Sequence, residues 1–437
     1  GGSAVQFSQG DYAIAIGEVA GSSYQGTLAV AIGNAAGEFT QGAHSVAIGY
    51  LAGYVAQGDS SVAIGRGPGL TNQGDHAIAI GRNAAQVNQG GNATQGAIAI
   101  GLNTGQTNQG VGAVAMGTSA GANNQGSTSV AIGISAGSSA QGSRCVAIGD
   151  SAGQTSQAVG GGNSAIAIGY QAGQLNQFGT CVAIGIQAGQ NNQSLEAVAI
   201  GDRAGQISKG FASVAIGQLA GNTLQGDRSV ALGYQAAQST QGFNAVAIGY
   251  LAAQNQQGQN GIALGSFAGQ TYQSFGSIAI GSAAGGISQG STSIAIGQNT
   301  AQNNQGINCI AIGGKSGLTN QHDQAISIGY FSGVSSGQNE QATNAISIGT
   351  DAGKFTQGTA AIAIGLNAGQ SNQGANAIAI GQSSGQAGQS ANSIVINASG
   401  SAVNGATAGF YARPIRSIVT AGTSVLQYNT TTFELGY

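Results

Sequence analysis

Four pentapeptides have the G-x-S-x-G spacing of a serine-hydrolase nucleophile turn, in which a serine hydroxyl attacks a carbonyl carbon. They are residues 117–121, 133–137, 149–153 and 381–385. All four occupy the same position in a longer repeat. The spacing is therefore a by-product of that repeat, and we expect none of these serines to be a nucleophile.

Other residues could in principle serve phosphate binding or metal binding. Gly314-Lys315-Ser316 resembles the end of a phosphate-binding loop, but Cys309 stands where the first glycine of that loop belongs. His44 and His76 share a repeat position with Ser60 between them, and they lack partners for a metal site. The sequence therefore predicts no enzymatic activity, no catalytic residue, no cofactor and no metal site.

The three cysteines also share one repeat position, which otherwise holds only alanine, serine or glycine. Cys145 and Cys181 are two units apart, which is about 10 Å if each unit adds one strand spacing, and too far for a disulfide. We expect Cys145, Cys181 and Cys309 to be small packed residues. A role between chains is the alternative.

The register that these residues share is a repeat of sixteen residues. A glycine, here called the marker glycine, closes a short apolar run in 23 successive units, and Asn397 takes the last such place. Twenty of the 23 intervals between these 24 positions are sixteen residues long, and three are twenty. Such strict self-similarity indicates a repeat architecture in which each unit packs on its neighbours.

Side chains alternate in size within each apolar run. The third residue before the marker is valine or isoleucine in all 24 units, and the residue directly before it is isoleucine in all but three. The second residue before it is alanine in 21 of 24 units, and the fourth is always small. Because strand side chains alternate between faces, one face is aliphatic and the other small.

Composition excludes several classes of protein. Glycine makes up 80 of 437 residues, tryptophan is absent and charged residues are 5%. Glycine does not recur every third residue, so collagen is excluded. A net charge of −3 without a basic cluster predicts no nucleic-acid partner. No apolar run is long enough to span a bilayer, so we expect no membrane insertion.

A sixteen-residue unit with one short apolar strand fits one coil of a parallel β-solenoid. We expect valine and isoleucine to fill the tube, and the glycines at the marker and after the recurrent glutamine to form corners with positive φ. Ala52-Gly53 and its equivalents are expected to form the opposing wall. The glutamine eight residues after the marker is expected to stack as an amide ladder. Twenty-four coils would make a rod of roughly 115 Å.

The small face raises a separate question, because alanine is a mediocre strand former and yet persists there. A flat alanine and serine face lets a second backbone approach closely. We therefore predict that this face, represented by Ala47, Ala131 and Ala147, is a subunit interface. The alternative is that this face is simply exposed and has no binding role.

The runs at residues 45–49, 129–133 and 213–217, all Ser-Val-Ala-Ile-Gly, resemble the repeats of trimeric autotransporter adhesin heads. The resemblance covers residues 1–397, although the adhesin unit is slightly shorter and lacks the added A-G and Q-G elements. It implies a homotrimer of left-handed β-rolls. The predicted fold class is thus all-β, a parallel β-solenoid of sixteen-residue coils, as a rod over residues 1–397.

The last forty residues leave the repeat. Residues 408–416 and 425–435 carry aromatic side chains in alternation and read as strands, with a turn near Asn429–Thr431. The pattern GFY-x-x-PIR followed by LQYN is similar to the segment before the intramolecular chaperone of viral tail and capsid fibres. It implies that residues 398–437 are a β-stranded trimerisation segment.

These features together predict a structural, adhesive trimeric fibre rather than an enzyme. The favoured interpretation is an extracellular virion fibre that attaches to a host-surface glycan or protein receptor. A cellular trimeric adhesin head, placed on a cell surface, is the first alternative. A monomeric ice-binding solenoid is the second, although it needs a regular threonine array that the small face lacks.

The three long intervals are the candidate receptor contacts, because insertions in solenoids emerge as loops on one side. We place them at residues 91–96, 159–164 and 339–344. Neutral variation in length is the alternative. Tyrosines at one corner, such as Tyr234 and Tyr250, are either a sugar-stacking rib or ordinary packing. The candidate loop contacts are Asn92, Thr94, Gln95, Asn163, Ser164, Asn339, Glu340 and Gln341.

Overall fold

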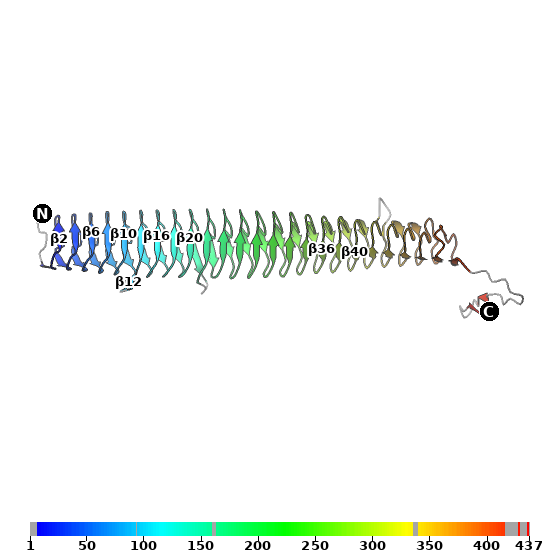
Figure 1. The fold of residues 1–437 in the computed structure, drawn as a ribbon, viewed down its shortest axis with the longest axis horizontal. Helices are drawn as coiled ribbons and strands as arrows, with labels where there is room; N and C mark the ends of the chain where they lie inside the picture. The colour runs from blue at the N-terminus through cyan, green and yellow to red at the C-terminus, as the bar shows by residue number, and fades with distance from the viewer. Residues whose placement is uncertain are drawn as a thin grey trace.

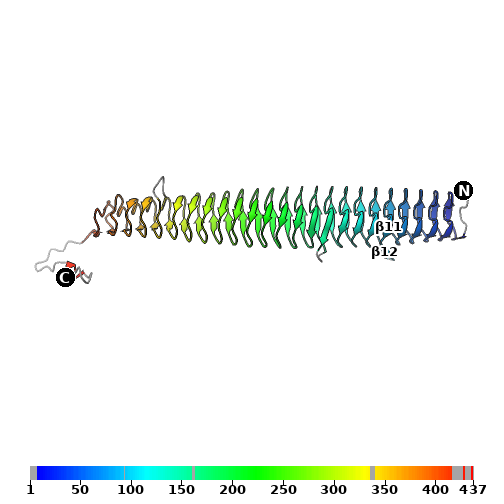
Figure 2. The same cartoon turned by 180° about the vertical axis from the view of Figure 1, so that it is seen from behind.

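The computed structural model describes residues 7–92, 94–159, 163–334, 340–415, 427–428 and 435–436. They are all-β, and stacked coils form a long straight rod whose strand colours run in order from one end to the other (Figure 1, Figure 2). The predicted parallel β-solenoid with coils of about sixteen residues is confirmed.

Each coil contains two short strands joined by two turns. In the coil that begins at Val46, strand β6 (Val46–Ile48) is followed by a turn over residues 49–54 and then by β7 (Val55–Gln57). A second turn over residues 58–61 leads to the next coil. The predicted opposing wall at Ala52-Gly53 is therefore wrong: these residues form the turn, and the wall is the strand that ends at Gln57.

The first strands of successive coils form one ladder, which we call the aliphatic sheet. Its strands are β2 (Ile14–Ile16), β4 (Val30–Ile32), β6 (Val46–Ile48), β8 (Val62–Ile64), β10 (Ile78–Ile80), β14 (Ile98–Ile100), β16 (Val114–Met116), β18 (Val130–Ile132), β20 (Val146–Ile148), β22 (Ile166–Ile168), β24 (Val182–Ile184), β26 (Val198–Ile200), β28 (Val214–Ile216), β30 (Val230–Leu232), β32 (Val246–Ile248), β34 (Ile262–Leu264), β36 (Ile278–Ile280), β38 (Ile294–Ile296), β40 (Ile310–Ile312), β42 (Ile326–Ile328), β43 (Ile346–Ile348), β45 (Ile362–Ile364), β47 (Ile378–Ile380), β48 (Ile394–Asn397) and β49 (Phe410–Arg413).

The second strands form the other ladder, which we call the glutamine sheet. Its strands are β1 (Phe7–Gln9), β3 (Ser23–Gln25), β5 (Phe39–Gln41), β7 (Val55–Gln57), β9 (Thr71–Gln73), β11 (Val87–Gln89), β15 (Thr107–Gln109), β17 (Asn123–Gln125), β19 (Ser139–Gln141), β21 (Thr155–Val159), β23 (Leu175–Phe178), β25 (Asn191–Gln193), β27 (Ile207–Lys209), β29 (Thr223–Gln225), β31 (Ser239–Gln241), β33 (Asn255–Gln257), β35 (Thr271–Gln273), β37 (Ile287–Gln289), β39 (Asn303–Gln305) and β41 (Thr319–Gln321), continued through bridges at Gln341 by β44 (Phe355–Gln357) and β46 (Ser371–Gln373).

Both ladders are parallel, and each residue pairs with its equivalent in the next coil. Ala47 pairs with Ala63 in the aliphatic sheet, and Gln41 pairs with Gln57 in the glutamine sheet. Identical side chains therefore stack in columns along the rod. The sequence repeat becomes a spatial repeat of about one strand spacing, 4.8 Å.

The inner and outer faces are the reverse of the prediction. Ala47, Ala52 and Ser61 are completely buried, and Gln57 is 2% exposed. The aliphatic side chains of β6 instead point outward and are only partly covered. The interior is thin, because the Gln57 amide reaches across it to the opposite strand. Alanine, serine and a glutamine fill it in most coils, and the valine and isoleucine side chains on either side of Ala47 point outward. Thr104, Thr300 and Val395 are the buried β-branched exceptions.

This arrangement overturns the predicted subunit interface at the small face. Ala47, Ala131 and Ala147 are each 0% exposed inside their own chain. A side chain that is sealed within its coil cannot touch a second subunit. The persistence of alanine at these positions has a different cause, namely the narrow gap between the two sheets of one chain.

Glycine is required at the two corners for two different physical reasons. Gly49 has φ 124°, which only glycine adopts readily, as predicted for the marker position. Gly58 does not have positive φ, so that part of the prediction is wrong. A Cβ at Gly58 would lie 2.5 Å from the carbonyl carbon of Gly74, so close stacking of coils requires glycine there.

Left-handed backbone at non-glycine residues also recurs in every regular coil. In the coil of β6 and β7, Leu51, Ala56 and Ser60 have φ between 52° and 55°. Asparagine tolerates this conformation better than most residues. This explains why asparagine is frequent at the position of Ala56, as in Asn72 with φ 55°.

The parallel ladder continues beyond the predicted boundary at residue 397. Strand β49 pairs with β48 in register, with Phe410 opposite Ile394. Further on, β50 (Gln427–Tyr428) pairs antiparallel with β51 (Leu435–Gly436), so the two ends of the predicted stranded region 425–435 pair with each other. The predicted turn at Asn429–Thr431 lies outside the described residues.

The burial of Ala131 predicts the effect of placing a charge there. Ala131→Glu should unfold the surrounding coils rather than separate intact chains, because a buried, unpaired carboxylate costs several kcal/mol. Thermal unfolding followed by circular dichroism should show a clear loss of stability. Full thermal stability of the Ala131→Glu chain would contradict the assignment of this side chain to the interior.

Candidate binding surfaces

The first long interval folds as a small hairpin on the side of the rod. Strand β12 (Gly91–Asn92) pairs antiparallel with β13 (Gln95–Gly96), and the hairpin stands out from the coils (Figure 1). Thr94 and Gln95 are exposed, as expected for contact residues. The side chain of Asn92 lies outside what the structure describes.

The second long interval stays paired in the glutamine sheet to Val159, which lies opposite Phe178 after a register shift that follows Gln157. Asn163 and Ser164, the two predicted contacts, are exposed. Their backbone is held to neighbouring coils, since Ser164 N–H donates to Ser143 O at 3.2 Å and Thr180 N–H donates to Asn163 O at 3.2 Å. The rod therefore presents these side chains on an anchored segment.

The third long interval is arranged differently from the prediction. Gln341 stands eight residues before marker Gly349 and takes the ladder position, where it is 1% exposed. It receives a hydrogen bond from Ser327 Oγ at 2.6 Å and donates to Gln357 at 3.1 Å. The extra residues thus precede the glutamine, and Gln341 is not a surface contact. Asn339 lies outside the described residues.

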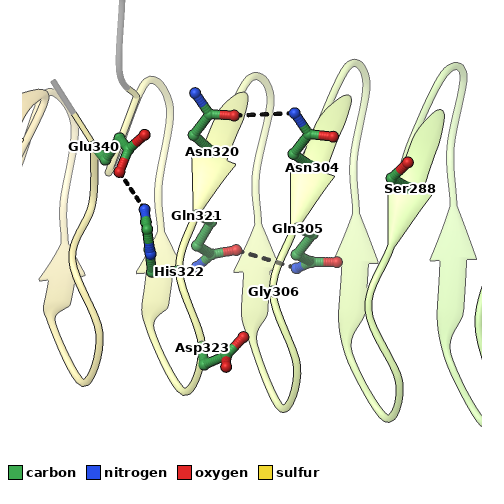
Figure 3. A pocket seen from close by; sticks show the side chains of 9 residues that line it. All are labelled: Ser288, Asn304, Gln305, Gly306, Asn320, Gln321, His322, Asp323 and Glu340. Atoms are coloured by element: carbon green, nitrogen blue, oxygen red, sulfur yellow. Dashed lines mark hydrogen bonds and ion pairs between the residues drawn. The ribbon is translucent and has the colours of Figure 1, made fainter. Parts of the chain in front are cut away.

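Glu340 is exposed beside a shallow groove of about 410 Å³ on the glutamine-sheet side of the rod (Figure 3). Its carboxylate contacts the ring of His322. Both side chains are more than 40% exposed, at 43% and 45%. The sequence spacing of eighteen residues gave little sign that the long interval would bring them together.

Most of the other side chains that line the groove already have hydrogen-bond partners. Asn304 donates to Asn320 at 3.1 Å along the rod, and the Asp323 carboxylate accepts from the backbone N–H of Ile307 at 2.8 Å. Figure 3 shows the two asparagines in one column above the buried Gln305 and Gln321. The groove offers amide and carboxylate groups to a polar ligand.

The aliphatic side chains form the most extended candidate surface. Two of them per coil, over 24 coils, point outward from one sheet. Ile132 and Ile148 are each 37% exposed, and Leu264 is 42% exposed. Continuous apolar surface of this extent marks an interaction site in soluble proteins. The alternation was visible in the sequence, but which face points inward was not.

The tyrosine corner contains one stacked pair. The rings of Tyr234 and Tyr250 have centroids 5.3 Å apart and are within 10° of parallel. Phe267 meets Tyr250 edge-on, with a centroid distance of 5.3 Å. Each ring thus uses a face or an edge on its neighbour, which agrees with the packing alternative for these residues.

The buried glutamines form the ladder that the sequence predicts. Gln109 donates to Gln125 at 3.1 Å, and Gln241 donates to Gln257 at 3.0 Å. The same nitrogens also donate across the interior to the aliphatic sheet, as from Gln109 Nε2 to Ile98 O at 2.7 Å. One side chain therefore links neighbouring coils and the two sheets of its own coil.

Lys209 replaces glutamine in this ladder and is 1% exposed. Its Nζ donates to Gln225 Oε1. Burial lowers the pKa of the Lys209 ammonium from 10.5 to about 7, because the interior offers little to replace water, while Cys181 raises it slightly. Burial therefore disfavours the charged form of Lys209 inside an otherwise uncharged core.

The three cysteines are buried and free, as predicted. Burial raises the pKa of the Cys181 and Cys309 thiols to about 11 and also raises that of Cys145, so they are unreactive thiols. Among the described residues no three His, Cys, Asp or Glu side chains gather closely enough to hold a metal ion. The described chain also has no helix of the length and apolarity that crossing a membrane requires.

Comparison with known proteins gives no relative. No protein-family model matches the chain, and no curated protein sequence is significantly similar to it. The geometry of the rod and its surfaces is therefore the basis for assigning a function.

The environment of Lys209 predicts a pH-dependent stability. Below pH 7 the ammonium is charged in both states, and the fold bears the full cost of burying it. Between pH 7 and 10.5 the folded chain loses the proton while the unfolded chain keeps it, so stability rises with pH. The gain is on the order of 3–5 kcal/mol.

Lys209→Gln restores the ladder residue and should raise the melting temperature at pH 6. The gain should shrink as the pH approaches 10, where the lysine of the native chain is neutral in the fold. Lys315→Gln, which removes a lysine outside the ladder, is the matched control. A difference in melting temperature between the Lys209→Gln chain and the native chain that stays constant from pH 6 to pH 10 would contradict this explanation.

Proposed function

We propose that the chain forms the rod of a homotrimeric extracellular fibre that attaches to a host surface. The observation that carries the proposal is the uninterrupted aliphatic face. A soluble rod with two outward aliphatic side chains per coil over 24 coils needs a partner for that face. A partner with the same repeat, a second copy of this chain, matches it along its whole length.

The energetics favour assembly. Complete burial of an aliphatic side chain contributes roughly 1.5–3 kcal/mol, and these side chains are already partly covered. Even a fraction of that value, repeated along the rod, exceeds the roughly 4–15 kcal/mol that association costs in lost freedom. The subunit number of three rests on the resemblance to adhesin heads, and the aliphatic face replaces the alanine face as the proposed interface.

The attachment role rests on the shape and on the exposed insertions. A rod that repeats its side chains in columns presents the same loops once per subunit, so weak sites gain avidity. The receptor would be a host-surface glycan or protein. A virion fibre is the favoured setting because of the C-terminal resemblance, and a cellular adhesin head is the alternative.

The assembly is tested by placing charges on the aliphatic face. Ile132→Glu together with Ile148→Glu should leave each coil folded, since both side chains point outward, but should block association. Light scattering should then give the 42.2 kDa of one chain rather than about 127 kDa, three times that mass. Ile134→Glu, at a corner where the side chain is 57% exposed, is the matched control and should not change the mass.

An assembled mass that is unchanged by the Ile132→Glu and Ile148→Glu substitutions would refute the aliphatic interface. A monomeric native chain would refute assembly altogether. A mass of twice 42.2 kDa would retain the interface and contradict the subunit number.

Attachment is tested by shortening the insertions. Removing residues 92–95 and 160–163 turns two twenty-residue intervals into regular sixteen-residue coils. The shortened rod should keep its melting temperature and bind cells several-fold more weakly, measured with a fluorescent label. Undiminished cell binding by the shortened rod would assign these segments to neutral length variation.

A further inference from the structure

A second depression, of about 260 Å³, lies at the corner that follows strands β6, β8 and β10. It exists because Gly67 stands where the adjacent coils carry Leu51 and Asn83. A Cβ at Gly67 would meet only the Oδ1 atom of Asn83, at 3.4 Å. The missing side chain therefore leaves a hollow in an otherwise continuous column of corner residues.

Two arginines line this hollow from consecutive coils. Arg66 and Arg82 each follow a marker glycine directly, so they stack at about one strand spacing, 4.8 Å. Both are exposed, and neither guanidinium makes a hydrogen bond or ion pair with any other described residue. By contrast, Arg203 pairs with Asp202 at 3.3 Å.

The pairing of like charges in adjacent coils is unfavourable without a counter-charge. The chain carries only ten lysines and arginines in 437 residues, and two of them converge here. The two adjacent positions of this corner column hold Tyr50 and Leu102, neither of which is acidic. The arrangement is that of an anion-binding pair, because guanidinium groups bind sulfate and carboxylate groups through two parallel hydrogen bonds.

The remaining polar groups of the hollow suit hydroxyl groups. Asn83 donates to Asn103 at 3.1 Å, which leaves its Oδ1 directed toward the hollow. Gln86 accepts from Gln106 at 3.0 Å, which leaves its amide nitrogen as a donor. Tyr50, 50% exposed, adds an aromatic ring at the rim.

We propose that this hollow binds an acidic saccharide. Arg66 and Arg82 hold its sulfate or carboxylate group, Asn83 and Gln86 bond to its hydroxyl groups, and the ring of Tyr50 packs against the sugar face. This assignment names the ligand class for the proposed attachment function and rests on it for its biological setting. The binding itself is a property of one chain.

Binding is measured by calorimetry on the whole rod with five probes: a sulfated hexasaccharide, a sialylated oligosaccharide, a neutral hexasaccharide, inorganic sulfate and a polythymidine strand. At least one acidic saccharide should bind, and the neutral one should not. The pair Arg66→Gln and Arg82→Gln should weaken binding at least tenfold. The pair Arg144→Gln and Arg228→Gln removes the same charge at other exposed corners and should leave binding unchanged.

Gly67→Asn separates shape from charge. It keeps both arginines and fills the hollow with the side chain that Asn83 carries at the equivalent place in the next coil, where φ is 54°. Because Pro68 follows, the substitution should lower the melting temperature slightly, and the coils should stay folded by circular dichroism. It too should weaken binding of the acidic saccharide at least tenfold. Binding that survives Gly67→Asn, or that survives loss of both arginines, would overturn the proposal.

Two further outcomes would also overturn it. Inorganic sulfate that binds as tightly as the saccharides would indicate a simple anion site, and a polythymidine strand that binds as tightly would indicate general polyanion attraction. Cell attachment is scored separately with the same variants. If saccharide binding fails while cells are still bound, only this inference falls; if the reverse holds, the proposed attachment function falls.

Discussion

The narrow gap between the two sheets of each coil is the constraint on which the rest of the structure depends. A single glutamine side chain spans it, since Gln57 Nε2 reaches Val46 O at 2.9 Å from the opposite strand. Mostly small side chains, chiefly alanine and serine, fit beside that amide. The columns of Ala47 and Ala52 therefore hold alanine because it is small enough for the interior, and not because it is strongly hydrophobic. Valine and isoleucine point outward.

An interior of this kind stabilises the chain weakly, because alanine contributes little apolar area per residue. Hydrogen bonds of the glutamine ladder and the two parallel sheets supply continuity from coil to coil. The outward aliphatic side chains are only partly buried within one chain. Their burial against a partner would therefore stabilise the rod and the proposed assembly together. Lys209 marks a local departure, where the ladder is kept and a titratable group is buried with it.

Much of this architecture could be read from the sequence. The sixteen-residue period, the parallel register and the stacked glutamine column follow from residues that recur at fixed spacing, such as Gln109 and Gln125, whereas the burial of that column was not predicted. The direction of the strand faces could not, because alternation states only that Ala47 and Val46 point opposite ways. The position of Gln341 was also missed, since an insertion before the ladder residue gives the same interval length as one after it. The meeting of His322 with Glu340 depends on that same choice.

The central proposal, that the aliphatic face packs between chains while the alanine face is enclosed within one chain, is tested most directly by disulfide trapping. Cysteines placed singly at Val130, Ala131 or Ile132 in a background without native cysteines would be oxidised in the assembled fibre. The account predicts covalent dimers on a denaturing gel from Val130→Cys or Ile132→Cys and none from Ala131→Cys. Dimers from Ala131→Cys alone would contradict it.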